Sequence, residues 1–140
     1  MTIPVFVLLG FAAWTMLTLI GSIGVYRWSR ILTGRTSIAE WYDNAPRSSD
    51  WYQRAVRAHM NCVETLPVYG AIVLTLVVTG LTSPFMDGIA LTILVTRIGQ
   101  TLVHIVLPPS NTSASLRFAL FSFQLVGMMT MGIMIVAHAI

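Results

Sequence analysis

The sequence predicts an all-α integral membrane protein, a bundle of four transmembrane helices in one domain. Hydrophobic residues make up 56% of its 140 residues and charged residues only 9%, and its mean hydropathy is +0.78. An average soluble domain is ~25% charged, so this composition cannot supply a water-facing surface. The apolar residues also gather in four long stretches, each near the ~20 residues that a membrane-spanning helix needs.

The first two helices follow from uncharged stretches. Ile3–Tyr26 contains no charged residue. It lacks the basic start of a cleaved signal peptide and is too long for its apolar segment, so we expect it to remain as a helix. Thr65–Met86 is also uncharged, and its helix is expected to begin earlier, near Trp51, with a polar first half.

The last two helices lie between clusters of turn-forming residues. Gly88–Leu107 is interrupted only by Arg97, and Phe118–Ile140 contains no acid or arginine. Clusters at Gly80–Asp87 and Pro108–Ser113 separate these helices from their neighbours. We therefore predict a single domain, 1–140, with helices over approximately 3–28, 51–80, 85–107 and 115–139.

The same composition excludes several classes of protein. A soluble globular protein and a disordered chain are incompatible with so few charges. The sequence pI near 9.6 comes from eight arginines and no lysine against five acids. So few charges form no basic stripe, so no nucleic-acid partner is expected. Cys62 is the only cysteine, which excludes an intrachain disulfide and a site with several cysteine ligands, and we expect no metal.

The positions of the arginines predict an orientation in the membrane. Arg27, Arg30, Arg35 and Arg47 lie in the first connection and Arg117 at the third, whereas the termini and the second connection have none. The positive-inside rule then places the first and third connections in the cytoplasm and both termini outside, in a bacterial inner membrane or an endoplasmic-reticulum-type membrane. An aromatic belt is expected at the cytoplasmic boundary, formed by Trp28, Trp41, Tyr42, Trp51 and Tyr52.

Polar residues inside the spans form three stripes. At ~100° per residue, the polar residues of helix two fall within about 80° and those of helix three within about 100°. The stripes are Arg54, Arg57, Asn61 and Glu64; Arg97, Gln100, Thr101 and His104; and Arg117 with Gln124 on helix four. Because ionisable groups within a membrane are costly, each is a candidate functional residue. We expect the three stripes to meet in one cationic cavity in the cytoplasmic half.

Such a cavity suits an anionic, peptide-like ligand. Guanidinium groups pair with carboxylates or phosphates, and amide side chains suit peptide groups. Glu64 could accept a hydrogen bond from an amine. A plainer interpretation also stands: Glu64 and Arg97 could form a buried ion pair between helices two and three. Asn61 and Gln124 could likewise serve as hydrogen-bonding contacts between helices.

The run from Arg54 to Pro67 resembles the MAPEG family, the membrane-associated proteins in eicosanoid and glutathione metabolism that include microsomal glutathione transferases. The pattern Arg-Ala-x-x-Asn-x-x-Glu-x-x-Pro falls on Arg57, Asn61, Glu64 and Pro67. The resemblance extends over the chain, with Arg97 in helix three and Arg117 opening helix four.

The resemblance implies a homotrimer of four-helix bundles that binds glutathione, as co-substrate, between neighbouring subunits. Membrane lipids and a lipophilic electrophile or lipid would be the other partners. Arg117 resembles the catalytic arginine near the glutathione sulfur. The other implied binding residues are Arg27, Arg54, Arg57, Asn61, Glu64, Arg97, Gln100 and His104.

The implied activity is that of a transferase or peroxidase. A free thiol has a pKa of ~8.5, and a nearby cation favours the thiolate. Arg117 would thus activate glutathione toward lipophilic electrophiles or lipid hydroperoxides. Some relatives have tyrosine where this chain has Thr65, His104 and Phe121. A non-catalytic lipid-binding or scaffolding protein is therefore an alternative, as is a small four-helix exporter that uses Glu64.

Overall fold

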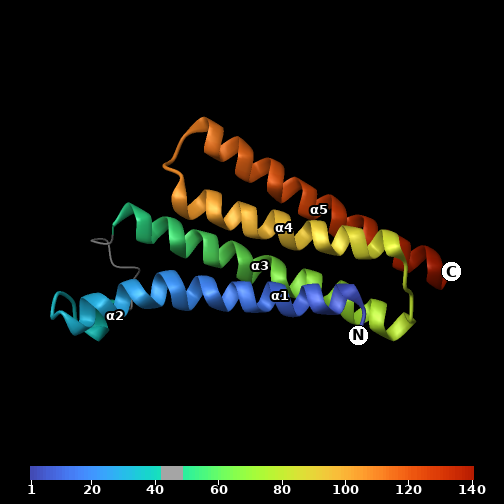
Figure 1. Ribbon diagram of the computed structural model, residues 1–140, viewed down its shortest axis with the longest axis horizontal. Helices are drawn as coiled ribbons and strands as arrows, with labels where there is room; N and C mark the ends of the chain where they lie inside the picture. Colours follow the sequence, from blue (N-terminus) through green and yellow to red (C-terminus); the bar gives the residue numbers. More distant parts are fainter. Residues whose placement is uncertain (42–48) are drawn as a thin grey trace.

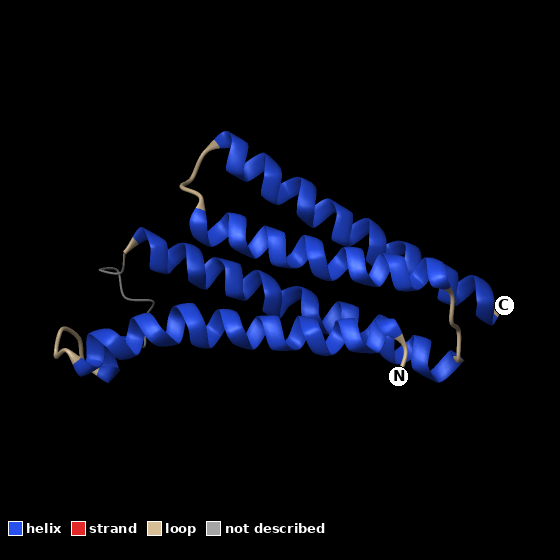
Figure 2. Ribbon diagram, in the orientation of Figure 1, coloured by secondary structure: helices blue, strands red, loops and turns tan. Residues whose placement is uncertain are grey.

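The computed structural model describes residues 1–41 and 49–140, and helices make up most of this part of the chain (Figure 2). Four helices in this part of the chain are long and apolar enough to cross a membrane. This confirms the predicted all-α membrane fold. Tyr42, Arg47 and the second half of the first connection were part of the sequence predictions and lie outside the described residues.

The first span is one continuous helix of 30 residues, Ile3–Leu32. It consists of α1 (Ile3–Thr18), a π-helical segment η1 (Leu19–Gly24) and α2 (Val25–Leu32). A π-helical turn contains more residues per turn than an α-helix and therefore rotates the residues that follow it. The helix continues past the predicted end at residue 28, and a short 3-10 helix, η2 (Ile38–Trp41), follows it.

The other three spans are α3 (Asp50–Thr79), α4 (Pro84–Val106) and α5 (Asn111–Ala139). Their ends follow local chemistry. Gly80 ends α3 with a φ of 66°, a left-handed conformation that glycine adopts without strain. The Ser83 side chain caps α4 just ahead of Pro84, where proline is favoured because its missing N–H needs no partner.

The helices run alternately up and down along the long axis (Figure 1). α4 packs against α1, α3 and α5, and α1 also packs against α3. Both termini lie at the end that carries the α3–α4 connection, and the α4–α5 connection lies at the opposite end (Figure 1). The hydrophobic core between the helices includes Phe11, Tyr69, Ile93, Met131 and the thiol of Cys62.

Many large apolar side chains lie on the outside of the bundle. Phe6, Val78, Phe118 and Val136 are all more than half exposed. Such a surface would be unfavourable in water, whereas it suits contact with lipid tails. Gly127 allows α5 to approach α4 closely, since a Cβ atom there would lie 3.1 Å from Ile89 Cγ2.

Candidate functional site

Arg97 of α4 is the centre of a polar network inside the bundle. Its side chain is only 1% exposed. Its Nη1 donates to Gln100 Oε1 at 3.0 Å and its Nη2 to the Thr65 hydroxyl at 2.6 Å. Its guanidinium carbon lies 5.3 Å from the ring centroid of Phe11. One buried cation therefore connects α4 with α3 and α1.

Gln100 extends this network to α5. Its Oε1 also accepts a hydrogen bond from Gln124 Nε2 at 3.1 Å, and its Nε2 donates to the backbone carbonyl of Arg117 at 3.2 Å. Both glutamines are buried. The interpretation of Gln124 as a hydrogen-bonding contact between helices is confirmed, and Gln100 fixes the backbone at the position of the candidate catalytic arginine.

The alternative of a buried ion pair between Glu64 and Arg97 is wrong for the described chain. Arg97 donates to Thr65 and Gln100, whereas the Glu64 side chain is exposed on the surface of the chain. The reason is angular: Thr65 is one residue further along α3, so its side chain points about 100° away from that of Glu64 and toward α4.

Arg117 and His104 form a second pair nearer the end of the bundle. Arg117 Nη1 lies 3.2 Å from His104 Nδ1. A guanidinium only donates hydrogen bonds, so Nδ1 is the acceptor and the neutral imidazole has its proton on Nε2. Two of the predicted site residues, from α4 and α5, are therefore in contact.

The polar stripe of α3 does not line an interior cavity with Arg97 and Gln100. Arg57 and Glu64 are exposed and Asn61 and Arg54 are half-buried. The α3 stripe therefore lies on the outer surface of the single chain, and the cavity expected where the three stripes meet stays a prediction. The stripe faces outward because the opposite face of α3 is apolar and packs in the core, through Tyr52, Ala55, Ala58, Cys62 and Tyr69.

Arg27 contacts a cluster of aromatic side chains, two of which the sequence analysis had assigned to a belt at the membrane boundary. Its Nε donates to Tyr52 Oη at 2.6 Å, and its guanidinium carbon lies 5.4 Å from the centroid of Trp41. Tyr52 in turn stacks on Tyr26, with centroids 4.7 Å apart. Trp41 and Tyr52 were expected in an aromatic belt at the membrane boundary, but both are buried.

The burial of Tyr52 could have been predicted from the spacing of apolar residues along α3. Tyr52, Ala55 and Cys62 recur at spacings that place them on one side of a helix, opposite to Arg57. An aromatic residue in that series is a core position rather than a residue of a lipid interface. Within residues 1–41 and 49–140, no group of three His, Cys, Asp or Glu side chains could hold a metal ion.

Four apolar helices with buried polar networks define a multi-pass integral membrane protein of the four-helix-bundle class. The chain belongs to the MAPEG family, whose model matches residues 3–137, nearly its whole length. Comparisons with curated proteins and with solved structures gave no match. Membership supports, in broad terms, a membrane function related to glutathione metabolism, in a family that includes transferases, peroxidases and non-catalytic members.

Proposed function

We propose that the protein is a membrane-embedded glutathione transferase that also reduces lipid hydroperoxides. The observation that carries this proposal is the position of Arg117. Its backbone is fixed by Gln100 and its guanidinium donates to His104. The family to which the chain belongs adds the chemical context.

Glutathione would bind along the outward stripe of α3. Arg57 and Asn61 offer donors for carboxylate and amide groups, and Glu64 offers an acceptor for the ammonium group. Arg54 and Arg27 lie nearer the end of the bundle and would contact the second carboxylate. Arg97 and Gln100 are buried, and both Nη atoms of Arg97 and both side-chain polar atoms of Gln100 form hydrogen bonds. We therefore propose that they act as positioning residues, through Thr65 and Arg117, while His104 lies beside the thiol.

A second copy of the chain would cover this stripe. Glu64 lies fourteen residues after the start of α3, well within the span, and is exposed on the isolated chain. An ionised carboxylate facing lipid is costly, so the stripe needs a polar ligand and a neighbouring subunit. We propose a homotrimer with its first and third connections in the cytoplasm. Native mass spectrometry in detergent should find three chains per particle.

The reaction needs few groups. Arg117 would stabilise the glutathione thiolate, whose proton leaves to solvent. In a transfer, the sulfur forms a bond to an electrophilic carbon while the bond to the leaving group breaks, and the leaving group takes the electron pair. In a peroxidase reaction, the sulfur attacks the distal peroxide oxygen, the O–O bond breaks and the alkoxide takes up a proton. A second glutathione then releases water and forms the disulfide.

The test is glutathione thiolate formation near neutral pH, followed by ultraviolet absorbance of the purified protein. Wild-type protein and the control Arg35→Ala, which changes an exposed arginine in the first connection, should give the thiolate signal. Arg117→Ala should bind glutathione without that signal. An unchanged signal in Arg117→Ala would remove the role of Arg117, and absence of glutathione binding by wild type would overturn the proposed function.

The binding site has its own test. Arg57→Ala and Glu64→Ala should each weaken glutathione binding by about 1–3 kcal/mol, the scale of a charged hydrogen bond. Wild-type affinity in both variants would contradict the assignment of this stripe. Phe121, half-buried one turn after Arg117, favours the second candidate function, lipid binding without catalysis. Protein that binds lipid but neither binds nor ionises glutathione would establish that alternative.

A further inference from the structure

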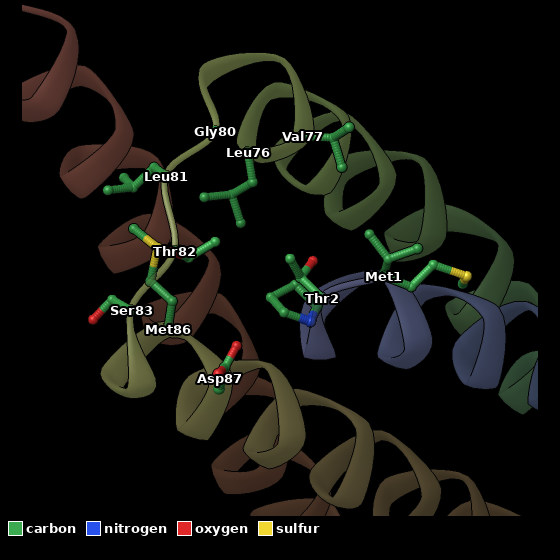
Figure 3. A pocket seen from close by; sticks show the side chains of 12 residues that line it. Met1, Thr2, Leu76, Val77, Gly80, Leu81, Thr82, Ser83, Met86 and Asp87 are labelled. Atoms are coloured by element: carbon green, nitrogen blue, oxygen red, sulfur yellow. The ribbon is translucent and has the colours of Figure 1, made fainter.

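A cavity of about 300 Å³ lies at the end of the bundle opposite to Arg117. It is formed between the N-terminal segment, the end of α3, and the connection that leads into α4 (Figure 3). Its walls are mostly apolar, with Pro4, Leu76, Leu81 and Met86 among them. This volume is at the lower end of the range of ~300–1,000 Å³ for small-molecule sites.

Asp87 is the only ionisable side chain among the residues that line this cavity. It is half-buried, and Figure 3 shows its carboxylate directed from α4 toward the N-terminal segment. Among the described residues no side chain pairs with this carboxylate. Asp87 lies in the first turn of α4, close to the connection that follows α3.

Met1, which carries the α-ammonium group, also lines this cavity, but it is 77% exposed and forms no ion pair with Asp87. An apolar cavity whose one ionisable side chain is acidic selects for a particular chemistry. A neutral apolar molecule would leave the carboxylate without a partner, and an inorganic cation would gain nothing from the apolar walls. A monovalent organic cation with a compact apolar body satisfies both parts of the site. Met86, only 1% exposed, adds a polarisable and adaptable contact for such a body.

We propose that this cavity is a binding site for an amphiphilic ammonium compound, with Asp87 as the counter-ion. The site is separate from the proposed glutathione site, since the two lie at opposite ends of the bundle. The ammonium group could belong to a free molecule or to a lipid headgroup, and the two sources share the same recognition by Asp87 and the apolar walls.

The test compares two probes of nearly the same shape, phenyltrimethylammonium and tert-butylbenzene, on the full chain in maltoside micelles. Methionine ¹³C-methyl resonances report binding, with Met86 at the cavity and Met128, buried in the core, as an internal reference. The cation should shift the Met86 resonance saturably. Asp87→Asn should weaken its binding by about fivefold or more, on the scale of a half-exposed ion pair.

The control variant is Glu40→Gln, which makes the same chemical change at an exposed residue and should bind the cation like wild type. The affinity for tert-butylbenzene should be the same in all three proteins. Equal affinity of wild type and Asp87→Asn for the cation, or no saturable shift of Met86, would overturn the proposal. Circular dichroism and the Met128 resonance verify that each variant is folded.

A competition experiment identifies the source of the ammonium group. Displacement of the probe by phosphatidylcholine but not by phosphatidylglycerol would support a lipid headgroup as the ligand. Failure of both lipids to displace the probe would support a free amphiphilic cation. Displacement by both lipids to the same extent in wild type and Asp87→Asn would show an apolar lipid contact and would overturn the proposal.

Discussion

Arg97 Nη2 lies 2.6 Å from the hydroxyl oxygen of Thr65, so the buried cation of α4 is fixed to α3 by a neutral residue. The same hydroxyl donates to the backbone carbonyl of Asn61 at 2.7 Å. Thr65 therefore connects the Arg97 network to the stripe that carries Asn61 and Glu64. Thr65, at a position where some relatives have tyrosine, therefore has a defined hydrogen-bond partner in Arg97.

Replacing Thr65 with valine should destabilise the fold. Valine keeps the shape but removes the acceptor for Arg97 Nη2, and a buried charged donor left without a partner costs about 1–3 kcal/mol. The measurement is unfolding in mixed micelles followed by circular dichroism. Thr75→Val is the matched control, because Thr75 is exposed and bonds only to the carbonyl of Ala71 within its own helix. Equal stability of the two variants would show that the bond to Arg97 contributes nothing.

Changing each of the two buried glutamines to leucine should lower the stability of the fold by very different amounts. Gln100→Leu leaves Arg97 Nη1 without a partner, at about 1–3 kcal/mol, and removes the side-chain hydrogen bond to the Arg117 carbonyl, which keeps its partner within α5. Gln124→Leu removes an amide whose own Oε1 has no partner, so we expect a change within ~1 kcal/mol. Unfolding of both variants under the same conditions gives the comparison, and a larger loss for Gln124→Leu would contradict this account of the network.

Tyr52→Phe tests the aromatic cluster around Arg27. Phenylalanine keeps the stacking on Tyr26 and removes only the oxygen that accepts from Arg27 Nε. Because Arg27 is half-exposed, the loss of stability should be no more than about 1 kcal/mol. Glutathione affinity should also fall if Arg27 contacts a carboxylate.

Tyr26→Phe is the comparison for that variant, since the Tyr26 hydroxyl accepts only longer bonds, at 3.5 Å from Arg30 and 3.3 Å from the Ser49 amide. It should change glutathione affinity less than Tyr52→Phe. Unchanged affinity in Tyr52→Phe, measured by calorimetry, would remove Arg27 from the proposed binding site while leaving the cluster as a structural feature.

The start of α5 depends on a capping box at Ser110 and Ser113. The Ser110 side chain accepts from the Ser113 amide at 3.1 Å, and the Ser113 side chain accepts from the Ser110 amide at 3.0 Å. Ser110→Ala should cost about 1 kcal/mol and speed hydrogen exchange in the first turn of α5, ahead of Arg117. Ser115→Ala, an exposed change in the same helix, should leave exchange unaltered; equal rates in the two variants would show that the cap does not hold this turn.

This cap also explains why the last helix begins earlier than the sequence analysis predicted. The segment Pro108–Ser113 contains residue types that favour turns, so the helix was expected from about residue 115. The structure begins α5 at Asn111, because serine and asparagine are also good residues for a helix start when their side chains bond the free backbone amides. Which of the two roles such residues take depends on the local backbone geometry.

The spans, their number and the positions of the polar stripes could be read from the sequence, because hydrophobicity and helical periodicity are local properties. The hydrogen-bond partner of each buried polar group could not be read from the sequence. Arg97 bonds to Thr65 and Gln100 and not to Glu64. Adjacent residues of a helix point about 100° apart, so Thr65 faces α4 whereas Glu64 does not. Tyr52 is likewise buried because its ring packs on Tyr26 of α2 and Trp41 of η2, and neither contact could be read from its position in the sequence.

The sequence by itself therefore determined a four-span helical membrane protein of the MAPEG family, since a run of apolar residues can only be satisfied as a helix in lipid. Only the tertiary structure decided that Arg97 and Gln100 hold the helices together while Arg57 and Glu64 face outward. The physical reason is that a hydrogen bond depends on distances of a few tenths of an ångström between helices. Those distances come from how all four helices pack, and no single stretch of sequence contains them.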